Sequence, residues 1–387
     1  MHTINDPTIS SDEIVRPTLV EVDLHRLAGN FRAIRDHVAP ARVMPILKAN
    51  AYGHGLLRVA QLMESLGADY IGVAVLEEGI LLRQNGIRMP ILVLGGILGN
   101  QVPGFLKYNL AITASSIDKL AQVDEIAAQM GVKAKVHLKI DTGMERTGVH
   151  EYEARPFIES SLRCGHLQVE GIFSHFANSE SADLGHARLQ LERFHEVLGL
   201  YGALGAPVPP LRHMANSGAI LQLPESHFDM VRPGVMFYGI YPERGIQQTV
   251  DVRPAATWHS HVNFSKITEA GRPVSYGSLW QSDAPTRIVT IPCGYADGYF
   301  RRMTNRAQVI VKGRKYPQVG RICMDQFMVN LGEDDAAVGD PVILLGTAPG
   351  GERISAEDLA DWAGTNEYEV MTNISARVPR VAEPGRP

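Results

Sequence analysis

The chain has 387 residues, of which 45% are hydrophobic and 20% charged, with 37 basic side chains against 42 acidic ones. This length allows one large domain plus a smaller one, and the composition is ordinary for a globular protein. The slightly acidic balance, without any basic run, argues against nucleic acid as a partner.

Three cysteines, Cys164, Cys293 and Cys323, are odd in number and widely spaced. They form neither a zinc pattern nor a disulfide framework, which suits a reducing compartment. The polar start lacks the apolar core of a signal peptide, and the longest apolar stretch, 90–98, is too short to span a membrane. We therefore expect a cytoplasmic protein without a bound metal or a membrane segment.

Up to about residue 240, apolar runs typical of strands alternate with segments of helical length. The eight runs are VMPILK (43–48), YIGVAV (70–75), ILVLGG (91–96), LAITAS (110–115), KVHLKI (135–140), LQVEGIFSH (167–175), LRHMAN (211–216) and DMVRPGVMFYG (229–239). The clearest amphipathic segments between them are 116–130 and 183–200, whereas the connection at 96–109 is poorly helical. Eight strands alternating with helices favour a parallel (β/α)8 barrel of the TIM type over an open sheet.

After about residue 245 the pattern changes to short β-rich runs separated by glycine and proline turns. The runs RIVTIPC, QVIVKG, QFMVNL and PVILLG are accompanied by one good helical segment, 355–364. This pattern predicts a separate, mostly β domain. We expect the barrel at residues 1–242 and the β domain at 243–387, with an early strand at 18–24 that can pair with either.

Side chains suited to chemistry stand at the ends of the barrel runs, where active sites of such barrels lie. Lys48 ends the first run, Lys139 closes the fifth ahead of Asp141 and Arg146, His175 ends the sixth, Asn216 and Ser217 follow the seventh, and Arg232 and Gly234 stand in the eighth. The last two segments offer a hydroxyl and backbone N–H groups, which suit a phosphate.

Lys48 taken alone has two interpretations. A lysine that closes an apolar strand can be desolvated, and desolvation favours a neutral amine able to attack a carbonyl. The alternative is a lysine that extends its amine to water at the barrel rim, and position alone favours this second interpretation. The grouping of Lys48 with other strand-end residues favours a site.

The segment ILKANAYGHG (46–55) resembles the cofactor-lysine signature of alanine racemases, which use pyridoxal 5'-phosphate. The resemblance continues in order through HLKIDTGMERTGV (137–149), FSHFANSE (173–180), HMANSGA (213–219), MVRPGVMFYG (230–239), SYGSLW (275–280), IPCGYADGY (291–299), VGRICMDQ (319–326) and NEYEV (366–370). No single motif decides, but nine in order across both halves are specific.

The resemblance implies a role for each matching position. Lys48 matches the lysine that carries the cofactor as a Schiff base, and Tyr276 matches the second catalytic base. The cofactor surroundings would be Tyr52, His175, Asn216, Ser217, Arg232, Gly234, Val235 and Tyr368, with His175 against the pyridine ring and Arg232 at its nitrogen. Arg146 and Met324 match contacts to the substrate carboxylate, and Lys139 matches a lysine that many members carbamylate.

The same resemblance implies a homodimer in which the partner subunit completes each active site. It also implies that L-alanine and D-alanine are interconverted by two bases, which supplies D-alanine for peptidoglycan. Pro233 and Glu180 differ from the residues most common at these motif positions, and they leave the range of accepted substrates open.

Three alternatives remain at this point. The first is a racemase of broader specificity, for example for serine. The second is a non-catalytic barrel protein that binds the same cofactor, against which the β domain with Tyr276, Met324 and Tyr368 argues. The third is a decarboxylase, which Arg232 opposes because related decarboxylases present a carboxylate to the ring nitrogen.

Overall fold

The computed structural model describes residues 15–383 of the chain. The first 14 residues, which include most of the segment on which the expectation of no signal peptide rests, lie outside them, as do residues 384–387. The chain divides into two compact units. Of the described residues, 27–51 and 56–253 form one unit, and 15–26, 52–55 and 254–383 form the other. Among the described residues no helix is long and apolar enough to cross a membrane.

The larger unit is a parallel β/α barrel. Its strands are β2 (Arg42–Val43), β3 (Ile71–Val73), β4 (Ile91–Val93), β5 (Ala111–Ala114), β6 (Ala134–Asp141), β8 (Leu167–Phe173), β9 (Leu211–His213) and β10 (Met230–Val231), and β7 (Val149–His150) adds to β6. Strands β3, β4, β5, β6, β8 and β9 pair in that order, and β10 pairs with β2. Each of the eight expected runs overlaps one of these strands, so the predicted barrel is confirmed.

Backbone hydrogen bonds outside the regular ladders close the barrel. The N–H of Asp229 donates to Arg212 O at 3.1 Å, which joins β10 to β9. The N–H of Leu47 donates to Gly72 O at 2.7 Å, which joins the end of the first run to β3. The eight barrel strands are thereby joined into a closed ring, and β7, which pairs with β6 alone, is the exception.

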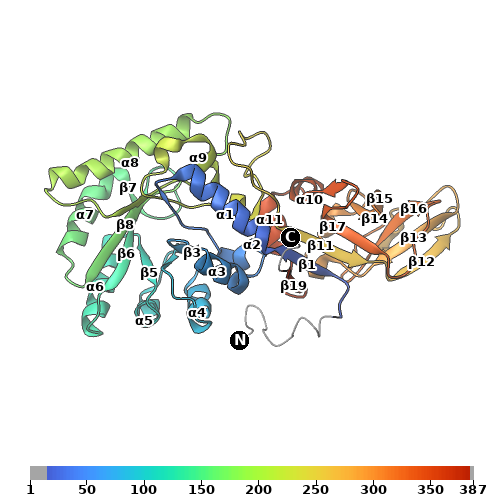
Figure 1. Ribbon diagram of the computed structural model, residues 1–387, viewed down its shortest axis with the longest axis horizontal. Coiled ribbons are helices and arrows are strands. Elements are labelled where there is room, and N and C mark those ends of the chain that lie inside the picture. Colours follow the sequence, from blue (N-terminus) through green and yellow to red (C-terminus); the bar gives the residue numbers. More distant parts are fainter. Residues whose placement is uncertain (1–14, 384–387) are drawn as a thin grey trace. The chain divides into compact units, whose positions relative to one another are not determined.

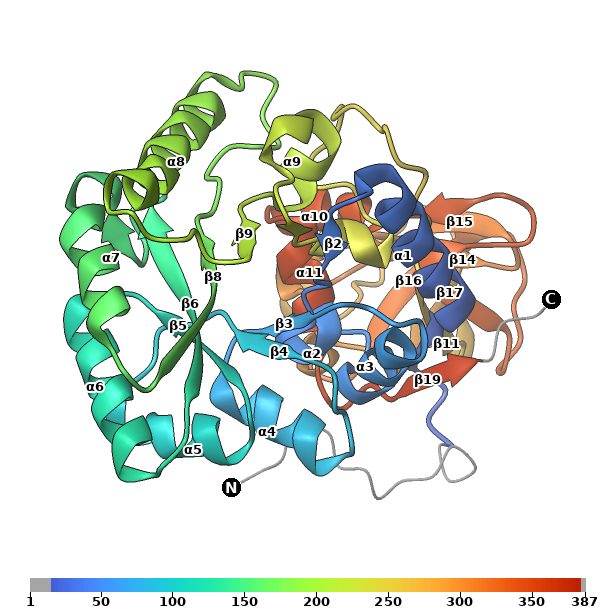
Figure 2. The same ribbon diagram turned by 60° about the vertical axis from the view of Figure 1, so that its left-hand side comes forward.

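Helices cover the outside of the barrel (Figure 1, Figure 2). They are α1 (Leu24–Val38), α3 (Leu56–Ser65), α4 (Leu76–Gln84), α5 (Val102–Lys107), α6 (Ile117–Gln129), α7 (Ala154–Arg163), α8 (Gly185–Ala203) and α9 (Ser217–Gln222). The hydroxyl of Ser116 accepts from the N–H of Lys119 at 3.1 Å and so begins α6. The poorly helical connection at 96–109 still forms α5, with a proline in its first turn, where the missing N–H costs nothing.

The smaller unit is mostly β, as predicted. Its main sheet runs β12 (Phe264–Thr268), β13 (Thr286–Ile291), β16 (Phe327–Gly332), β15 (Arg314–Val319), β14 (Gln308–Val311), β17 (Pro341–Thr347), β11 (Ala256–His261), β1 (Leu19–Asp23) and β19 (Arg380–Glu383), and β18 (Arg353–Ile354) pairs with β17. The early strand, whose partner the sequence left open, is β1. It pairs antiparallel with β11 and parallel with β19.

Two helices accompany this sheet, α10 (Ala356–Ala363) and α11 (Glu367–Asn373). The sequence predicts only the first, whose capping box joins Ser355 to Asp358. A comparable signal begins the second, because the side chain of Asn366 accepts from the N–H of Glu369 at 2.9 Å. The helix α11 was missed because seven residues are too few for a visible helical period.

Strand β8 approaches β6 closely at one glycine. The register of this pair shifts between Val136 and His137, so that Gly171 stands opposite His137. A Cβ on Gly171 would lie 2.3 Å from His137 Nδ1 and 2.8 Å from Leu211 O. The bulge and the missing side chain together make room for a buried imidazole inside the barrel.

We expect Gly171→Ala to lower the free energy of unfolding by roughly 1–3 kcal/mol, because the added methyl group overpacks a rigid barrel wall. Gly165→Ala, at a position with nothing within 4 Å of the added carbon, should change it by less than about 0.5 kcal/mol. Thermal and urea unfolding of both variants measure the difference, and equal stabilities would contradict the close approach.

Candidate functional site

Lys48 begins a short turn of unusual handedness. In α2 (Lys48–Tyr52), the four residues after the lysine have φ between +50° and +56°, and all of them carry a side chain. Left-handed backbone costs a residue with a Cβ about 1–2 kcal/mol. Such strain persists only where surrounding contacts hold it, and it is common at functional sites.

One buried carboxylate holds the start of this turn. Glu78, which is 5% exposed in the first turn of α4, accepts from the N–H of Ala49 at 2.7 Å. Its other oxygen accepts from the N–H groups of Ala74 and Val75 at 2.8 and 3.3 Å. Burial and the charge of Arg146 lower the pKa of Lys48, whereas the charge of Glu78 raises it.

Arg232 is buried at the end of β10 among acceptors that carry no charge. Its Nη1 donates to His213 Nδ1 at 2.9 Å. Its Nη2 donates to Ser174 O at 2.8 Å, to Met214 O at 3.1 Å and to His175 Nδ1 at 3.0 Å. Burial, followed by the charge of Arg146, lowers the pKa of Arg232 to about 9, which leaves it protonated near neutral pH.

The donor character of Arg232 determines the tautomers of three histidines. An arginine only donates, so Nδ1 of His213 and Nδ1 of His175 must accept and their protons reside on Nε2. His213 Nε2 then donates to His137 Nδ1 across 2.9 Å. Burial lowers the pKa of His137 to about 3 and holds the pKa values of His175 and His213 well below the ordinary range.

Lys139 lies in the wall of the same site, 5% exposed. Its Nζ donates to Ile140 O at 2.7 Å and lies 5.3 Å from the centre of the Phe173 ring. Burial lowers its pKa to about 7, although the charge of Asp141 opposes this. No carboxylate lies within 4.0 Å of Lys139 among residues 15–383, so it is not half of a simple ion pair.

Asp141 instead shapes the loop that carries Arg146. Its Oδ1 accepts from the N–H groups of Gly143, Met144 and Glu145 at 2.9, 2.8 and 3.2 Å. Its Oδ2 accepts from the N–H of Arg146 at 3.1 Å. Burial by itself would raise the pKa of Asp141, but these four hydrogen bonds lower it overall.

The segments after β9 and β10 meet at Ser217. Its buried hydroxyl accepts from the N–H of Gly234 at 2.9 Å and from that of Met236 at 3.4 Å. Asn216, whose side chain accepts from the N–H of Ala219, begins α9. A Cβ on Gly218 would lie 2.8 Å from the backbone at Ser179 and Glu180. The backbone is therefore closely packed where the sequence suggests a phosphate.

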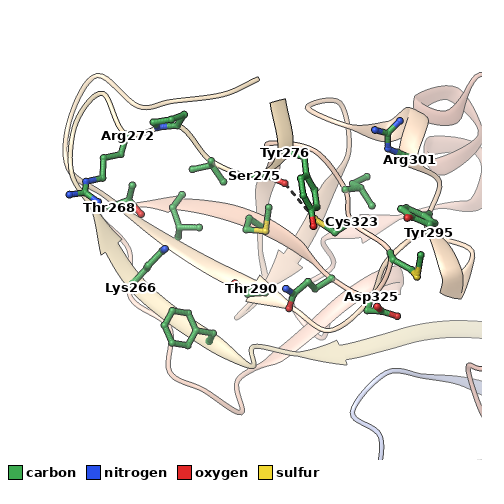
Figure 3. A pocket seen from close by; sticks show the side chains of 18 of the residues that line it. Lys266, Thr268, Arg272, Ser275, Tyr276, Thr290, Tyr295, Arg301, Cys323 and Asp325 are labelled. Carbon is green, nitrogen blue, oxygen red and sulfur yellow. Dashed lines mark hydrogen bonds between the residues drawn. The ribbon is translucent and has the colours of Figure 1, made fainter. Parts of the chain in front are cut away.

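Four of the sequence-predicted residues belong to the smaller unit. Tyr52 and Tyr368 lie there with ring centres 6.1 Å apart. Tyr276 and Met324, 72% and 53% exposed, line a pocket of about 1,030 Å³. Figure 3 shows Tyr276 and Cys323 among the residues that line this pocket, and Cys323 Sγ lies 3.5 Å from the hydroxyl of Ser275.

The other predicted residues belong to the barrel, and electrostatic contacts connect most of them. The charges of Arg232, Lys139, Arg146 and Lys48 all lower the pKa of His175. Ser217 contacts the backbone at Gly234, which precedes the buried Val235. The side chains that were expected at the ends of the barrel strands therefore lie in one region of the barrel.

Sequence reasoning gave no chemistry to Glu78, His137 or His213. Glu78 follows the second run by three residues. The expectation that active-site residues lie at the ends of barrel strands could therefore have identified it. His137 and His213 gave no comparable signal, because these two hydrogen-bonded residues are 76 residues apart in sequence.

Comparisons with known proteins agree on one family. The sequence profiles of the alanine racemase N-terminal and C-terminal domains match residues 22–242 and 255–382. The chain is 43% identical to the alanine racemase of Carboxydothermus hydrogenoformans, over 95% of this chain and 100% of that protein. It is 42% identical to that of Symbiobacterium thermophilum, over 95% and 97%.

The chain belongs to the alanine racemase family. Solved structures support the same assignment. The alanine racemase of Streptomyces lavendulae superposes with a TM-score of 0.90 at 36% identity, over 96% of this chain and 98% of that one. The enzyme of Bacillus anthracis, solved with bound L-Ala-P, gives a TM-score of 0.90 at 33% identity, over 96% of both chains.

Membership of this family implies the use of pyridoxal 5'-phosphate, and the barrel residues fit that group. Lys48, Lys139, Arg146 and Arg232 are four cations without a carboxylate within 4.0 Å among the described residues. Positive charge left uncompensated in a partly buried site suits an anionic ligand. The Nε–H of Arg232 also has no acceptor among residues 15–383, so it remains available to a ring nitrogen.

The neutral histidines predict how stability varies with pH. His137, His175 and His213 stay unprotonated when folded but gain a proton near pH ~6.5 when unfolded. The unfolded chain then binds more protons, so the free energy of unfolding should fall as the pH drops below about 6.5. Each histidine contributes up to about 1.4 kcal/mol per pH unit.

Urea unfolding at several pH values between about 5.5 and 6.5 measures this slope. The variant His213→Asn should lose about one third of it, because one of three contributing groups is gone. A free energy of unfolding that does not change with pH in this range would contradict the neutral network.

Proposed function

We propose that the chain interconverts L-alanine and D-alanine with pyridoxal 5'-phosphate bound in the barrel. The protein is an isomerase by family. The observation that carries the proposal is that Lys48, whose pKa burial lowers, and three further cations, Lys139, Arg146 and Arg232, have no carboxylate within 4.0 Å among residues 15–383. A phosphorylated cofactor and an amino-acid carboxylate supply the missing negative charge.

Nine residues would hold the cofactor. Lys48 would bind it covalently, Ser217 and the backbone at Gly234 would face its phosphate, and Arg232 and His175 would face its ring. The remaining members of the proposed set are Tyr52, Asn216, Val235 and Tyr368. When bound, the cofactor withdraws electrons from the α-carbon of the substrate and so eases removal of its proton.

Racemisation requires one acid–base group on each face of the α-carbon. We assign the D-face to Lys48, whose Nζ takes or returns the proton, and the L-face to Tyr276 through its hydroxyl. Arg146 and Met324 would contact the substrate carboxylate. In this arrangement Asp141 serves by holding the loop backbone that carries Arg146.

We further propose a homodimer in which the partner subunit provides Tyr276 to each site. The exposure of Tyr276 and Met324 in a pocket of the smaller unit supports this, because an isolated catalytic tyrosine in water has no substrate to act on. We place the protein in the cytoplasm, where D-alanine would enter peptidoglycan synthesis. We also propose that the barrel domain ends near residue 242 and the β domain follows.

Arg232 separates this reaction from decarboxylation. Its four recorded acceptors are neutral, and no carboxylate lies within 4.0 Å of it among the described residues. A donor at this position would leave the ring nitrogen of the bound cofactor without a proton, and the ring would then withdraw electrons more weakly. A racemase benefits from this restraint, because a strongly withdrawing ring favours side reactions.

Two alternatives to alanine racemisation differ in what opposes them. A cofactor-binding barrel without catalysis would lack the smaller unit, which here matches a C-terminal family profile over residues 255–382. A racemase of broader specificity would share every residue assigned above. Relative turnover of alanine, serine, lysine and arginine separates it from an enzyme dedicated to alanine.

We expect Tyr276→Phe to reduce L-alanine turnover at least about 100-fold, because one acid–base group is lost. Tyr152→Phe is a matched control, since Tyr152 is 73% exposed and Tyr276 72%. Purified, cofactor-loaded protein is followed by polarimetry or by a D-amino-acid oxidase couple. Near-normal L-to-D turnover by Tyr276→Phe would end this assignment.

We propose that Lys139 is carbamylated. Its pKa of about 7 leaves much of the amine neutral at neutral pH, and a neutral amine adds to CO2 with release of a proton. The product is an anion beside Arg146, which it would hold by charge-assisted hydrogen bonds. An acceptor at Lys139 would thus replace a cation that has no carboxylate partner.

A carbamate predicts a carbonyl signal in the NMR spectrum of protein equilibrated with ¹³C-labelled CO2, and this signal should be absent from Lys139→Ala. Activity should fall when CO2 is removed, and a small carboxylic acid should partly restore Lys139→Ala. Lys135→Ala, on the same strand with a side chain 35% exposed, should keep the signal. Full activity with an unmodified Lys139 would reject the proposal.

A further inference from the structure

Among the residues near Lys48, Glu78 has no role in the chemistry assigned above, yet it is almost fully buried. Burying a carboxylate is costly unless hydrogen bonds or an opposite charge compensate it. Glu78 has no cation within 4.0 Å among the described residues, and three backbone N–H groups compensate it instead. Such an arrangement points to a positional function.

The three N–H donors come from two separate places in the chain. Those of Ala74 and Val75 belong to the end of β3 and the start of α4, where Glu78 completes the capping of its own helix. That of Ala49 belongs to the turn after Lys48, which is 29 residues away in sequence. One side chain therefore joins the second βα connection to the lysine segment.

The bond to Ala49 acts on the strained part of the backbone. Ala49 has φ +53° and ψ +54°, a conformation that residues with a Cβ avoid. The rest of the turn is held by Ala51, whose N–H donates to Leu47 O at 2.8 Å, and by Asn50, whose side chain accepts from the N–H of Leu56 at 2.8 Å. The bond from Glu78 differs from these two in that it comes from another strand–helix connection.

We propose that Glu78 is a positioning residue that holds the left-handed turn at Ala49 and thereby directs Lys48 into the site. This inference rests on the proposed role of Lys48 as cofactor lysine and base. Without the carboxylate, Ala49 returns to ordinary right-handed or extended backbone, and the direction in which the chain leaves Lys48 changes. The neighbouring charge of Glu78 also counteracts the effect of burial on the Lys48 amine.

The variant Glu78→Gln tests the role with little change of volume. Its carboxamide has one acceptor oxygen, so it cannot satisfy both Ala49 and the donors of α4. We expect kcat for alanine to fall roughly tenfold to a hundredfold, because a lysine displaced by about 1 Å loses that much, with KM changing far less. Glu77→Gln is the control, since Glu77 is exposed in the same helical turn and should leave kcat unchanged.

A second-site change separates this role from simple capping of α4. Glycine adopts left-handed backbone without steric cost, so Glu78→Gln combined with Ala49→Gly should recover most of the lost kcat. Hydrogen exchange of the cofactor-free protein gives a readout independent of turnover. Exchange in residues 46–56 should quicken in Glu78→Gln and slow again in the double variant.

Two results would contradict the proposal. If Glu78→Gln behaves like Glu77→Gln, or if exchange quickens only in residues 74–84 and Ala49→Gly restores nothing, Glu78 merely caps α4. If Glu78→Gln does not fold, Ala49→Gly alone decides, since relief of strain should raise its melting temperature and an unchanged or lower one refutes the strain. If the wild type fails to racemise alanine while the exchange results hold, the proposed function fails, but the role of Glu78 in holding the turn at Ala49 stands.

Discussion

The barrel site depends on a guanidinium that can only donate and that neutral acceptors hold. Arg232 is buried with its two Nη nitrogens on imidazole nitrogens and carbonyl oxygens. This contact sets the tautomers of His175, His213 and His137, and the last of these requires the space left at Gly171. A charge kept in the barrel without a carboxylate leaves the site short of negative charge, which under the proposed function a phosphorylated cofactor and an amino-acid substrate would provide.

Negative charge in direct contact is also missing at the two lysines of the site, Lys48 and Lys139. Glu78 and Asp141 are the carboxylates that influence Lys48 and Lys139, yet both are occupied by backbone N–H groups. They organise two loops instead of neutralising the amines by contact. Burial therefore leaves the amines of Lys48 and Lys139 easier to deprotonate than those of ordinary lysines, as the proposed bond of Lys48 to a carbonyl and the proposed reaction of Lys139 with CO2 require.

Much of this site was predictable because parallel strands of a barrel end at a common face. The order of apolar runs placed Lys48, Lys139, His175 and Arg232 together without any contact being known. The motifs then named the family, which the domain profiles confirm. The contact between Glu78 and Ala49 was not predicted, because it depends on a backbone conformation that alanine rarely adopts and that the local sequence does not indicate.

The sequence by itself determined the barrel, the β-rich second half, the family and the side chains available for chemistry, since these follow from the period of apolar residues and from ordered motifs. Tertiary structure alone decided that residues 19–23 pair with β11 and β19, because the sequence of a single strand does not specify which strand it pairs with. It also decided the tautomers of the histidines and the left-handed turn after Lys48. Both arise from hydrogen bonds between residues far apart in the chain, which only the folded backbone brings within about 3 Å.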